Sequence, residues 1–378
     1  MIDKVYETII IGAGIAGLAC ARRLQEKDRD FLIISKDIGG RVLTSTDGRV
    51  NYGAFFVCLD YQNMLKYVKL KSRIKLSDFC FHRGNKRYVL FELKLIKYSF
   101  QFIKVLYLLY KFRKAFRRFR KASETISQKT AIEKDAFLHG LYMQKADIFV
   151  KKQKIQEVTD TYLAQGLYST TFSKPSGMNA FCFLQYLTPI ITPIYTFTFE
   201  KERMIKPFKD KIQLGYVNNI SYYNGQYKVT TDNKIFYAKN IVLATEIIIS
   251  KRFAGVEKTN APVDTHMLHI KGIPKSIIAR KDYQLFAHPS NVQAMARLED
   301  GTYLFYYKNV RPSLKDFFKE YSIVAHKHWD PAGTINGHTL IESNRGNNLY
   351  LIGDFNICGL EDAYITGIYA ANQILNSN

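Results

Sequence analysis

The sequence has few residues of the kinds that crosslink a chain or anchor it in a bilayer. Its 378 residues include five cysteines, and none of these has the spacing of a disulfide framework or of a zinc site. No segment reaches the ~18 uninterrupted apolar residues of a spanning helix, and none matches a nucleic-acid-binding module. We therefore expect reduced cysteines, no bound metal, no membrane-spanning helix and a cytoplasmic location.

Acidic residues are also scarce. The chain has 33 aspartates and glutamates against 55 lysines and arginines, which gives a formal net charge of +22. Residues 66–121 alone hold 18 cations and two acids, so this window carries +16 of the total. A charge excess this local predicts a surface that meets an anionic partner. The remaining composition, 47% hydrophobic and 14% aromatic, indicates a globular chain and excludes a disordered one.

What the chain does have is a strong pattern in its first forty residues. A β-branched run at 5–11 predicts a buried strand, residues from 15 to about 27 have helical spacing, and FLII at 31–34 predicts a second buried strand. Because the apolar N-terminal run is a strand that leads into a glycine turn, we expect no cleavable signal peptide. The order strand, glycine turn, helix, strand is that of a Rossmann βαβ unit.

The glycine turn has the spacing Gly-x-Gly-x-x-Gly at Gly12, Gly14 and Gly17. The first glycine permits the tight turn, the second lets a pyrophosphate approach the backbone, and the third lets the helix pack on the sheet. The helix that starts at Ile15 and Ala16 would turn its unpaired N–H groups toward the phosphates. The turn therefore predicts a dinucleotide-binding site.

Two short segments after the second strand indicate which dinucleotide binds. Residues 38–41 (IGGR) follow the strand, and residues 51–55 (NYGAF) come shortly after them. Together with the glycine turn, these segments resemble the N-terminal motifs of the flavin-containing amine oxidase, protoporphyrinogen oxidase and phytoene desaturase superfamily. The resemblance implies that FAD is the cofactor and that it lies beside Gly40, Arg41, Gly53 and Ala54.

Two positions depart from the family's pattern. The acid that binds the ribose in the family would fall on Ser35, next to Lys36, and Asp37 is the nearby residue that could replace it. The family's second acid corresponds to Asn51. A serine hydroxyl cannot accept hydrogen bonds from two ribose hydroxyls as a carboxylate does. The ribose contact is therefore the weak part of the predicted site.

The C-terminal end carries a second set of family-like motifs. Residues 348–351 (NLYL) predict a strand, which is followed by Gly-Asp, a glycine loop and a helix through about residue 375. In the family, this aspartate lies near the ribityl–pyrophosphate junction, and the positive end of the helix stabilises the reduced flavin. The resemblance thus assigns cofactor contacts to Gly353, Asp354, Ala363, Ile365 and Thr366. A structural alternative makes Glu361 and Asp362 caps of this helix.

The middle of the chain has one more cofactor-like segment. Residues 212–220, 226–231 and 234–237 predict a three-stranded meander with a hairpin turn at Asn224-Gly225. Residues 240–245 (NIVLAT) predict a buried strand. In the family, this order of elements lies under the flavin, which implies adenine pairing by the backbone of Val217 and cofactor contacts from Ala244 and Thr245.

The expected fold is α/β, with two discontinuous domains. A Rossmann-like FAD-binding domain takes residues 1–60, 205–260 and 335–378, and an α+β substrate domain takes 61–204 and 261–334. Aromatic residues of the substrate domain are expected to form core, or alternatively to line a cavity: Phe181, Phe183, Tyr186, Tyr195, Phe197 and Phe199.

The second half of the substrate domain offers weaker signals. Residues 315–320 suggest a helix, and 326–331 (HKHWDP) resemble an aromatic-and-proline turn of the family. Its two histidines, His326 and His328, have no third ligand in view, so we predict no metal there. Many amine-oxidising relatives place a lysine near the reactive flavin nitrogen, and Lys271 is the nearest candidate by order.

Residues 93–121 predict one long helix or two joined helices. The part at 98–110 is apolar nearly all round, and the following part sets Phe112, Phe116 and Phe119 among seven cations. A bulky apolar face beside a cationic face is typical of an interfacial helix on an anionic membrane. A core helix with a solvated basic end explains the same pattern, and nucleic-acid binding is a less favoured third interpretation.

The resemblance implies removal of two electrons from a C–C or C–N bond by hydride transfer to FAD. The first hypothesis is a desaturase or oxidase that acts on a hydrophobic small molecule drawn from a membrane. The second is a soluble amine oxidase, and the third is a reduced-flavin isomerase similar to the UDP-galactopyranose mutases. A fourth is a protein that keeps FAD structurally or modifies RNA.

Overall fold

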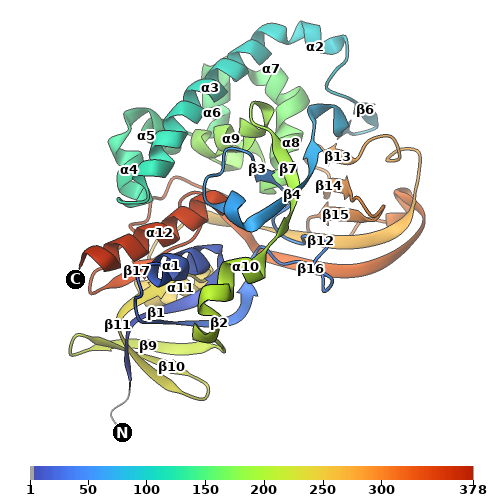
Figure 1. Ribbon diagram of the computed structural model, residues 1–378. Coiled ribbons are helices and arrows are strands. Elements are labelled where there is room, and N and C mark those ends of the chain that lie inside the picture. Colours follow the sequence, from blue (N-terminus) through green and yellow to red (C-terminus); the bar gives the residue numbers. More distant parts are fainter. Residues whose placement is uncertain (1–3, 378) are drawn as a thin grey trace.

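The computed structural model describes residues 4–377, which form three β-sheets and a layer of helices (Figure 1). The first sheet runs β8-β2-β1-β11-β10-β9, with β17 paired to β11. Its central strands are parallel, while β9 and β10 form an antiparallel extension. The strands are β1 (Val5–Gly14), β2 (Phe31–Gly39), β8 (Ile212–Leu214), β9 (Val217–Tyr223), β10 (Gln226–Thr231), β11 (Ile235–Leu243) and β17 (Leu349–Leu351).

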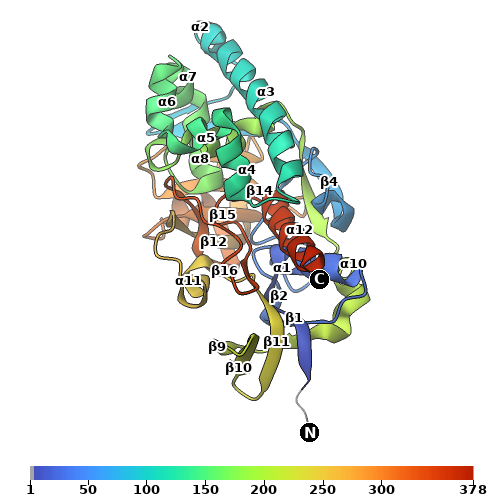
Figure 2. The same cartoon turned by 90° about the vertical axis from the view of Figure 1, so that its left-hand side faces the viewer.

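Helices cover both faces of the parallel part of this sheet, as its nearly continuous apolar strands require. On one face, α1 (Ile15–Gln25) and α12 (Leu360–Asn376) lie side by side, which brings the two ends of the chain together (Figures 1 and 2). Gly367 permits this contact because a Cβ there would collide with the carbonyl oxygen of Ala16. On the other face lies α11 (Ile247–Ala254).

A second sheet has the order β16-β12-β15-β14-β13-β5-β6, and a small third sheet has the order β3-β7-β4. The two longest strands, β12 and β16, pair along almost their whole length and form a curved antiparallel ribbon (Figure 1). The strands of these sheets are β3 (Val57–Cys58), β4 (Val68–Ile74), β5 (Phe79–Arg83), β6 (Lys86–Tyr88), β7 (Ile194–Phe199), β12 (Ala261–Pro274), β13 (Tyr283–Phe286), β14 (Val292–Arg297), β15 (Tyr303–Tyr307) and β16 (Phe318–Asn336).

A helical layer covers the second sheet and forms the upper part of the molecule in Figure 1. No helix in the described part of the chain is long and apolar enough to cross a bilayer. Its helices are α2 (Lys94–Lys97), α3 (Ser99–Ala122), α4 (Gln128–Lys134), α5 (Ala136–Met143), α6 (Ala146–Lys152), α7 (Gln156–Val158), α8 (Ala164–Thr171) and α9 (Ala180–Leu187). The short helix α10 (Lys201–Ile205) lies below this layer, beside α1 (Figure 1).

The phenylalanines in the basic half of α3 belong to the core. Phe112, Phe116 and Phe119 are almost fully buried and meet the edge of Phe181 on α9 at ring-centroid distances of 5.2, 5.5 and 6.0 Å. Edge-to-face contacts of this kind stabilise a core beyond the area that they bury. The interpretation of these three side chains as a membrane-facing surface is therefore wrong, and the core-helix interpretation is right for this half.

Most expected elements are present. The βαβ unit, the long C-terminal helix and the strand at 240–245 lie where the sequence predicts them, although the last of these is part of the longer strand β11. The hairpin turn is confirmed, because Asn224 and Gly225 have φ of 49° and 78°, as a type I′ turn requires.

Three expected elements are wrong. The single strand expected at 212–220 is two strands, because β8 pairs with β2 while β9 turns away to pair with β10. The helix expected at 315–320 is a short 3-10 turn, and the turn expected at 326–331 lies inside β16. For residues 318–336, the reason is a long-range interaction. Backbone pairing with β12 satisfies the hydrogen bonds along this segment and overrides its local structural preferences.

Candidate functional site

A cavity of about 790 Å³ lies where the first sheet, the second sheet and the helical layer meet. The glycine turn, the Gly-Gly-Arg segment and the C-terminal Gly-Asp segment all reach it, so both ends of the chain contribute to one site. Predicted cofactor residues that line this cavity are Gly12, Gly14, Ile15, Ala16, Ser35, Lys36, Gly40, Arg41, Gly53, Ala54, Val217, Ala244, Thr245, Gly353, Asp354 and Ala363.

The glycine turn is shaped to leave space over the start of α1. Gly12 has φ of +108°, and a Cβ there would lie 2.5 Å from the carbonyl oxygen of Ala244. A Cβ on Gly14, in contrast, would meet no described atom within 4 Å. Among the residues that the structure describes, no side chain caps α1, and its first turn holds no acid. The N–H groups of this turn therefore face the open space, as a phosphate site requires.

The side chain of Ser35 forms hydrogen bonds that hold the glycine turn in place. Its hydroxyl accepts a hydrogen bond from the N–H of Ala13 at 3.0 Å and donates one to the carbonyl oxygen of Asp37 at 2.7 Å. The carboxylate of Asp37, two residues further on, is exposed and lines the cavity. Val217 and Tyr216 line the same end of the cavity, and Lys36 lies over the ring of Tyr216.

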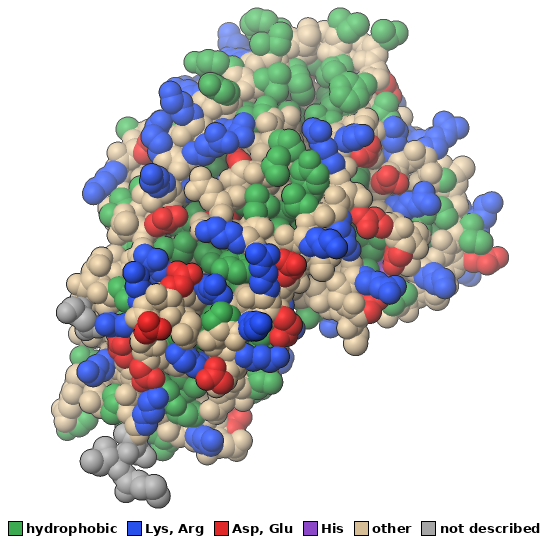
Figure 3. Space-filling view, viewed as in Figure 1, with side chains coloured by type: hydrophobic (Ala, Val, Ile, Leu, Met, Phe, Trp, Pro, Cys, Tyr) green, Lys and Arg blue, Asp and Glu red, His purple; other side chains and the backbone are tan. Residues whose placement is uncertain are grey.

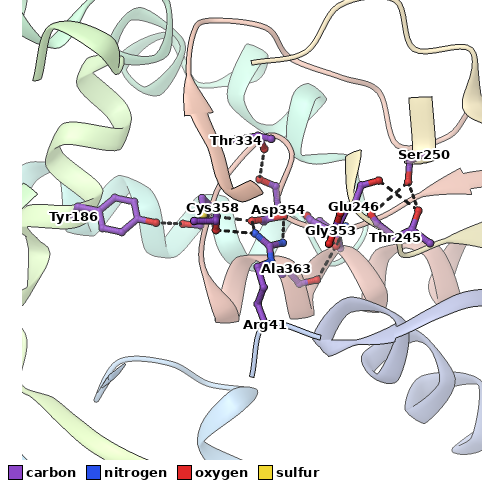
Figure 4. A network of polar contacts seen from close by, with 12 residues as sticks. Arg41, Tyr186, Thr245, Glu246, Ser250, Thr334, Gly353, Asp354, Cys358 and Ala363 are labelled. Carbon is purple, nitrogen blue, oxygen red and sulfur yellow. Dashed lines mark hydrogen bonds and ion pairs between the residues drawn. The ribbon is translucent and has the colours of Figure 1, made fainter. Parts of the chain in front are cut away.

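An ion pair joins the two cofactor motifs. The guanidinium of Arg41 donates two hydrogen bonds to Asp354, one of them at 2.6 Å (Figure 4). Burial raises the pKa of Asp354, but the Arg41 guanidinium outweighs burial and leaves this pKa below its ordinary value. The thiol of Cys358 also donates to Asp354 at 3.3 Å. Burial raises the pKa of this thiol to about 12, so it stays protonated at neutral pH.

Two acids tie the first turn of α12 to the rest of the molecule. Glu361 is buried and accepts hydrogen bonds from the backbone N–H groups of Gln62 and Met64, both at 2.9 Å. Asp362 is buried as well and accepts two hydrogen bonds from Arg120 of α3, at 3.0 and 2.9 Å. Both carboxylates bond to other segments, so the alternative that makes them caps of α12 is wrong.

The residues after these acids divide between cavity and core. Ala363 lines the cavity, but Ile365 and Thr366 are buried within the packed face of α12 and lie outside its lining. The hydroxyl of Thr366 accepts a hydrogen bond from the N–H of Gly353 at 2.9 Å, which holds the Gly-Asp turn against the helix. Gly17 likewise lies outside the lining, where it permits the contact between α1 and β1. These three residues position the site without facing the cavity.

The other end of the cavity is a chamber of large apolar side chains. Tyr162 and Tyr306 are nearly fully buried there, and their hydroxyls have no hydrogen-bond partner among the described residues. Buried hydroxyls without partners are costly, so they mark a place where a ligand group or water would bind. Other side chains of this chamber are Phe79, Phe81, Leu90, Phe102, Phe116, Phe172, Tyr283, Leu285 and Trp329.

The predicted aromatic cluster is core for the most part. Phe181, Phe183, Phe197 and Phe199 are buried away from the cavity, which confirms the favoured interpretation, and Tyr195 is not part of the lining either. Tyr186 is the exception: it lines the cavity, and its hydroxyl donates to the carbonyl oxygen of Cys358 at 3.2 Å (Figure 4).

Sequence reasoning missed several residues of the cavity. Glu246 directly follows the Ala-Thr pair, and burial raises the pKa of its carboxyl. Arg113, Arg117 and Arg120 of α3 also line the cavity. Arg113 lies 3.5 Å from Asp60, whereas Arg117 is exposed and has no acidic partner in the part of the chain that is described. The local charge excess pointed to these arginines, but only the fold shows that they face the cavity.

Two further candidates lie elsewhere. Lys271 is exposed on β12 and does not line the cavity. Within residues 4–377, the one lysine that lines the cavity is Lys36. His326 and His328 pack with a third histidine, His266, as stacked rings on the outer side of the β12–β16 ribbon. No group of side chains in the described chain has the arrangement of a metal site.

Asn51, the residue in place of the family's second acid, has a structural role. It is buried outside the cavity lining, and its amide donates a hydrogen bond to the carbonyl oxygen of Phe197 at 2.7 Å. This contact ties the segment after the Gly-Gly-Arg turn to β7. Asn51 therefore does not face the cavity.

Residues 10–69 match the family model of an NAD(P)-binding Rossmann-like domain, and no curated protein matches the sequence. Among solved structures, the chain is similar to putrescine oxidase with bound putrescine, at 13% identity and a TM-score of 0.69 over 99% of both chains. Cyclohexylamine oxidase from Brevibacterium oxydans is similar at 12% identity and 0.64, over 99% of this chain and 98% of that one. A CLA-producing fatty acid isomerase from P. acnes is similar at 13% and 0.66, over 100% of this chain and 99% of that one. The chain thus has a Rossmann-like domain within the two-domain fold of these proteins.

Proposed function

We propose that this protein, which has the fold of the solved amine oxidases, is an FAD-dependent oxidoreductase. It removes two electrons from a C–C or C–N bond of a hydrophobic small molecule. One observation carries the proposal: a single cavity of about 790 Å³ joins a glycine turn that fits a dinucleotide to a chamber that fits an apolar molecule. FAD, when bound, would supply the two-electron acceptor, because no side chain offers this chemistry.

The polar end of the cavity has the groups that FAD needs. The N–H groups at the start of α1 fit the pyrophosphate, because Gly14 leaves the space above them open. The carboxylate of Asp37 would accept from ribose hydroxyls, and the backbone of Val217 would meet the adenine. The pair of Arg41 and Asp354 holds the two cofactor motifs in one place.

The chamber end fits an apolar substrate better than a cationic amine. Its walls are mainly aromatic and aliphatic side chains, which exclude water from a bound molecule. Arg117 brings a positive charge to the cavity that no described acid pairs, and this charge would repel a protonated amine. The hydroxyls of Tyr162 and Tyr306 are free to orient one polar group of the substrate.

We infer a cytoplasmic location, and the cysteines support it. All five are unpaired and four are buried. Free thiols persist in a reducing compartment, which supports the cytoplasm.

Anaerobic mixing tests the proposed function. The FAD-loaded protein is mixed without oxygen with lipid-soluble alkenes and saturated precursors, and separately with polyamines and amino acids. We expect bleaching of the flavin absorption by members of the first group only. Bleaching by amines alone would replace the proposal with an amine oxidase. Catalysis that requires prior reduction and consumes no electrons would replace it with an isomerase.

A further inference from the structure

Six large apolar side chains form a stripe on the outside of α2 and α3. Their exposed fractions range from 64% to 86%, although residues of these types are usually buried. Their spacing alternates between three and four residues, which places them on one side of a helix. This apolar stripe consists of Leu93, Ile96, Phe100, Ile103, Tyr107 and Tyr110.

The stripe is not the side of the helix that packs on the protein. That side carries Val105, Leu109 and Phe112, which are at most 1% exposed. Figure 3 shows hydrophobic side chains gathered at the upper tip of the molecule, over α2, with lysines and arginines beside them. A continuous exposed apolar surface of this kind marks an interaction site.

Three lysines flank the stripe, whereas the acids beside it in the described chain are Glu92, just before its first residue, and Glu157, which accepts a hydrogen bond from Gln101 at 3.2 Å. Lys97, Lys104 and Lys111 each follow a stripe residue directly, and residues 93–121 contain no aspartate or glutamate. In heptad terms these lysines hold the e positions beside an a/d seam, where paired helices normally set opposite charges against each other. Two antiparallel copies of this helix would instead set lysine against lysine. The charge pattern therefore disfavours an antiparallel pair and matches an anionic surface.

We propose that the apolar stripe docks into the interface of a bilayer that contains anionic phospholipids. Leu93, Ile96, Phe100 and Ile103 would enter the boundary between headgroups and acyl chains. Tyr107 and Tyr110 have the amphipathic rings that membrane proteins place at headgroup level. The flanking lysines would meet the lipid phosphates.

Docking would bring the cavity wall to the bilayer. Another side of α3 lines the cavity through Phe102, Arg113 and Phe116, so one helix joins the lipid-facing stripe to the substrate chamber. If the proposed function holds, the substrate is then one that dissolves in the bilayer. The docking itself does not rest on the proposed function, because it uses no residue of the cofactor site.

Vesicle co-sedimentation of the full chain tests the docking. The probes are vesicles of phosphatidylcholine alone and vesicles that also contain phosphatidylserine. We expect binding to the anionic vesicles, weaker binding at high salt, and little binding to phosphatidylcholine alone. The double variant Phe100→Ser and Ile103→Ser should lower the partition coefficient at least about tenfold. Lys97→Glu with Lys111→Glu should weaken binding to the anionic vesicles alone.

A matched control carries the same change elsewhere. Tyr223 and Val310 are as exposed as the stripe residues but lie elsewhere, at the end of β9 and in the loop after β15, so Tyr223→Ser with Val310→Ser should leave vesicle binding unchanged. Circular dichroism and FAD content of every variant separate this test from folding and from the proposed function. Undiminished vesicle binding by the stripe variant would overturn the proposal. A concentration-dependent dimer in sedimentation equilibrium, lost in that variant, would overturn it in favour of a second copy of the chain.

Discussion

The two ends of the cavity are built from different parts of the polypeptide. At the cofactor end, main-chain segments approach so closely that a Cβ on Gly12 would lie 2.5 Å from the carbonyl oxygen of Ala244. At the chamber end, large side chains from α3, from residues 162–163 just before α8 and from the second sheet form the wall. We therefore expect substitutions at the cofactor end to decide whether the cofactor binds at all. Substitutions at the chamber end should decide which substrate fits.

The largest effect is expected at Gly14. Its φ of −73° suits any residue, and a Cβ would meet no described atom within 4 Å, so Gly14→Val should fold normally. The valine side chain would occupy the space of the phosphates and abolish FAD binding, as measured by flavin absorption of the purified protein. Gly140→Val, at a glycine with equally open surroundings on α5, is the control and should keep its FAD. Full FAD content in the Gly14 variant would contradict the assigned phosphate site.

Asp354→Asn should destabilise the protein by about 1–3 kcal/mol, because Arg41 then loses the partner of its charge but stays partly exposed to water. The folded-state pKa of Asp354 lies below its ordinary value of 3.8, so the ion pair contributes its full stability above about pH 4. This contribution is lost as the pH falls toward the lowered pKa.

Urea unfolding as a function of pH measures both effects. The wild type should lose stability as the pH falls below about 4, and the Asp354→Asn variant should lose less over the same range. Equal slopes for the two proteins would show that the pair of Arg41 and Asp354 does not contribute to the stability of the fold.

Tyr306→Phe tests the chamber end. Its hydroxyl is buried without a described partner, so its removal should leave the stability unchanged or raise it by up to about 1 kcal/mol. If the hydroxyl orients the substrate, kcat/KM should fall about tenfold while FAD content stays constant. Tyr223→Phe, at an exposed tyrosine, serves as control. A loss of FAD in the Tyr306 variant would contradict the claim that residues of the chamber end do not affect cofactor binding.

The smallest effect is expected at Asp37. Loss of one charge-assisted contact with the ribose should weaken FAD binding about fivefold to tenfold in Asp37→Asn. Equilibrium titration of the cofactor-free protein with FAD measures this change. Asp28→Asn, at an exposed aspartate outside the cavity, should bind like the wild type. An unchanged affinity for FAD in the Asp37 variant would show that the carboxylate of Asp37 does not bind the ribose.

The cofactor end could be predicted from the sequence because its constraints fall on single residues. A positive φ and a close backbone approach require glycine, so the turn at Gly12 is visible in the sequence itself. The same holds for the Asn224-Gly225 turn. The pairing of Arg41 with Asp354 was not visible, because it joins motifs that lie 313 residues apart.

The chamber end could not be predicted in the same way. Phenylalanines occur on several sides of α3, and tertiary packing, which includes the contact of Phe112 with Phe181, decides that Phe112 is buried while Phe100 is exposed. The long strand β16 depends on its pairing with β12, which no local pattern of residues 318–336 records. Side-chain orientation and long-range pairing are properties of the fold, so a single sequence leaves them open.

The central claim is that the two ends of the chain build one FAD site, and the absorption spectrum of the purified protein tests it most directly. The spectrum is recorded before and after denaturation, and the released cofactor is identified. We expect flavin bands in the folded protein and FAD in the released fraction. A colourless protein that does not acquire these bands when FAD is added would contradict it.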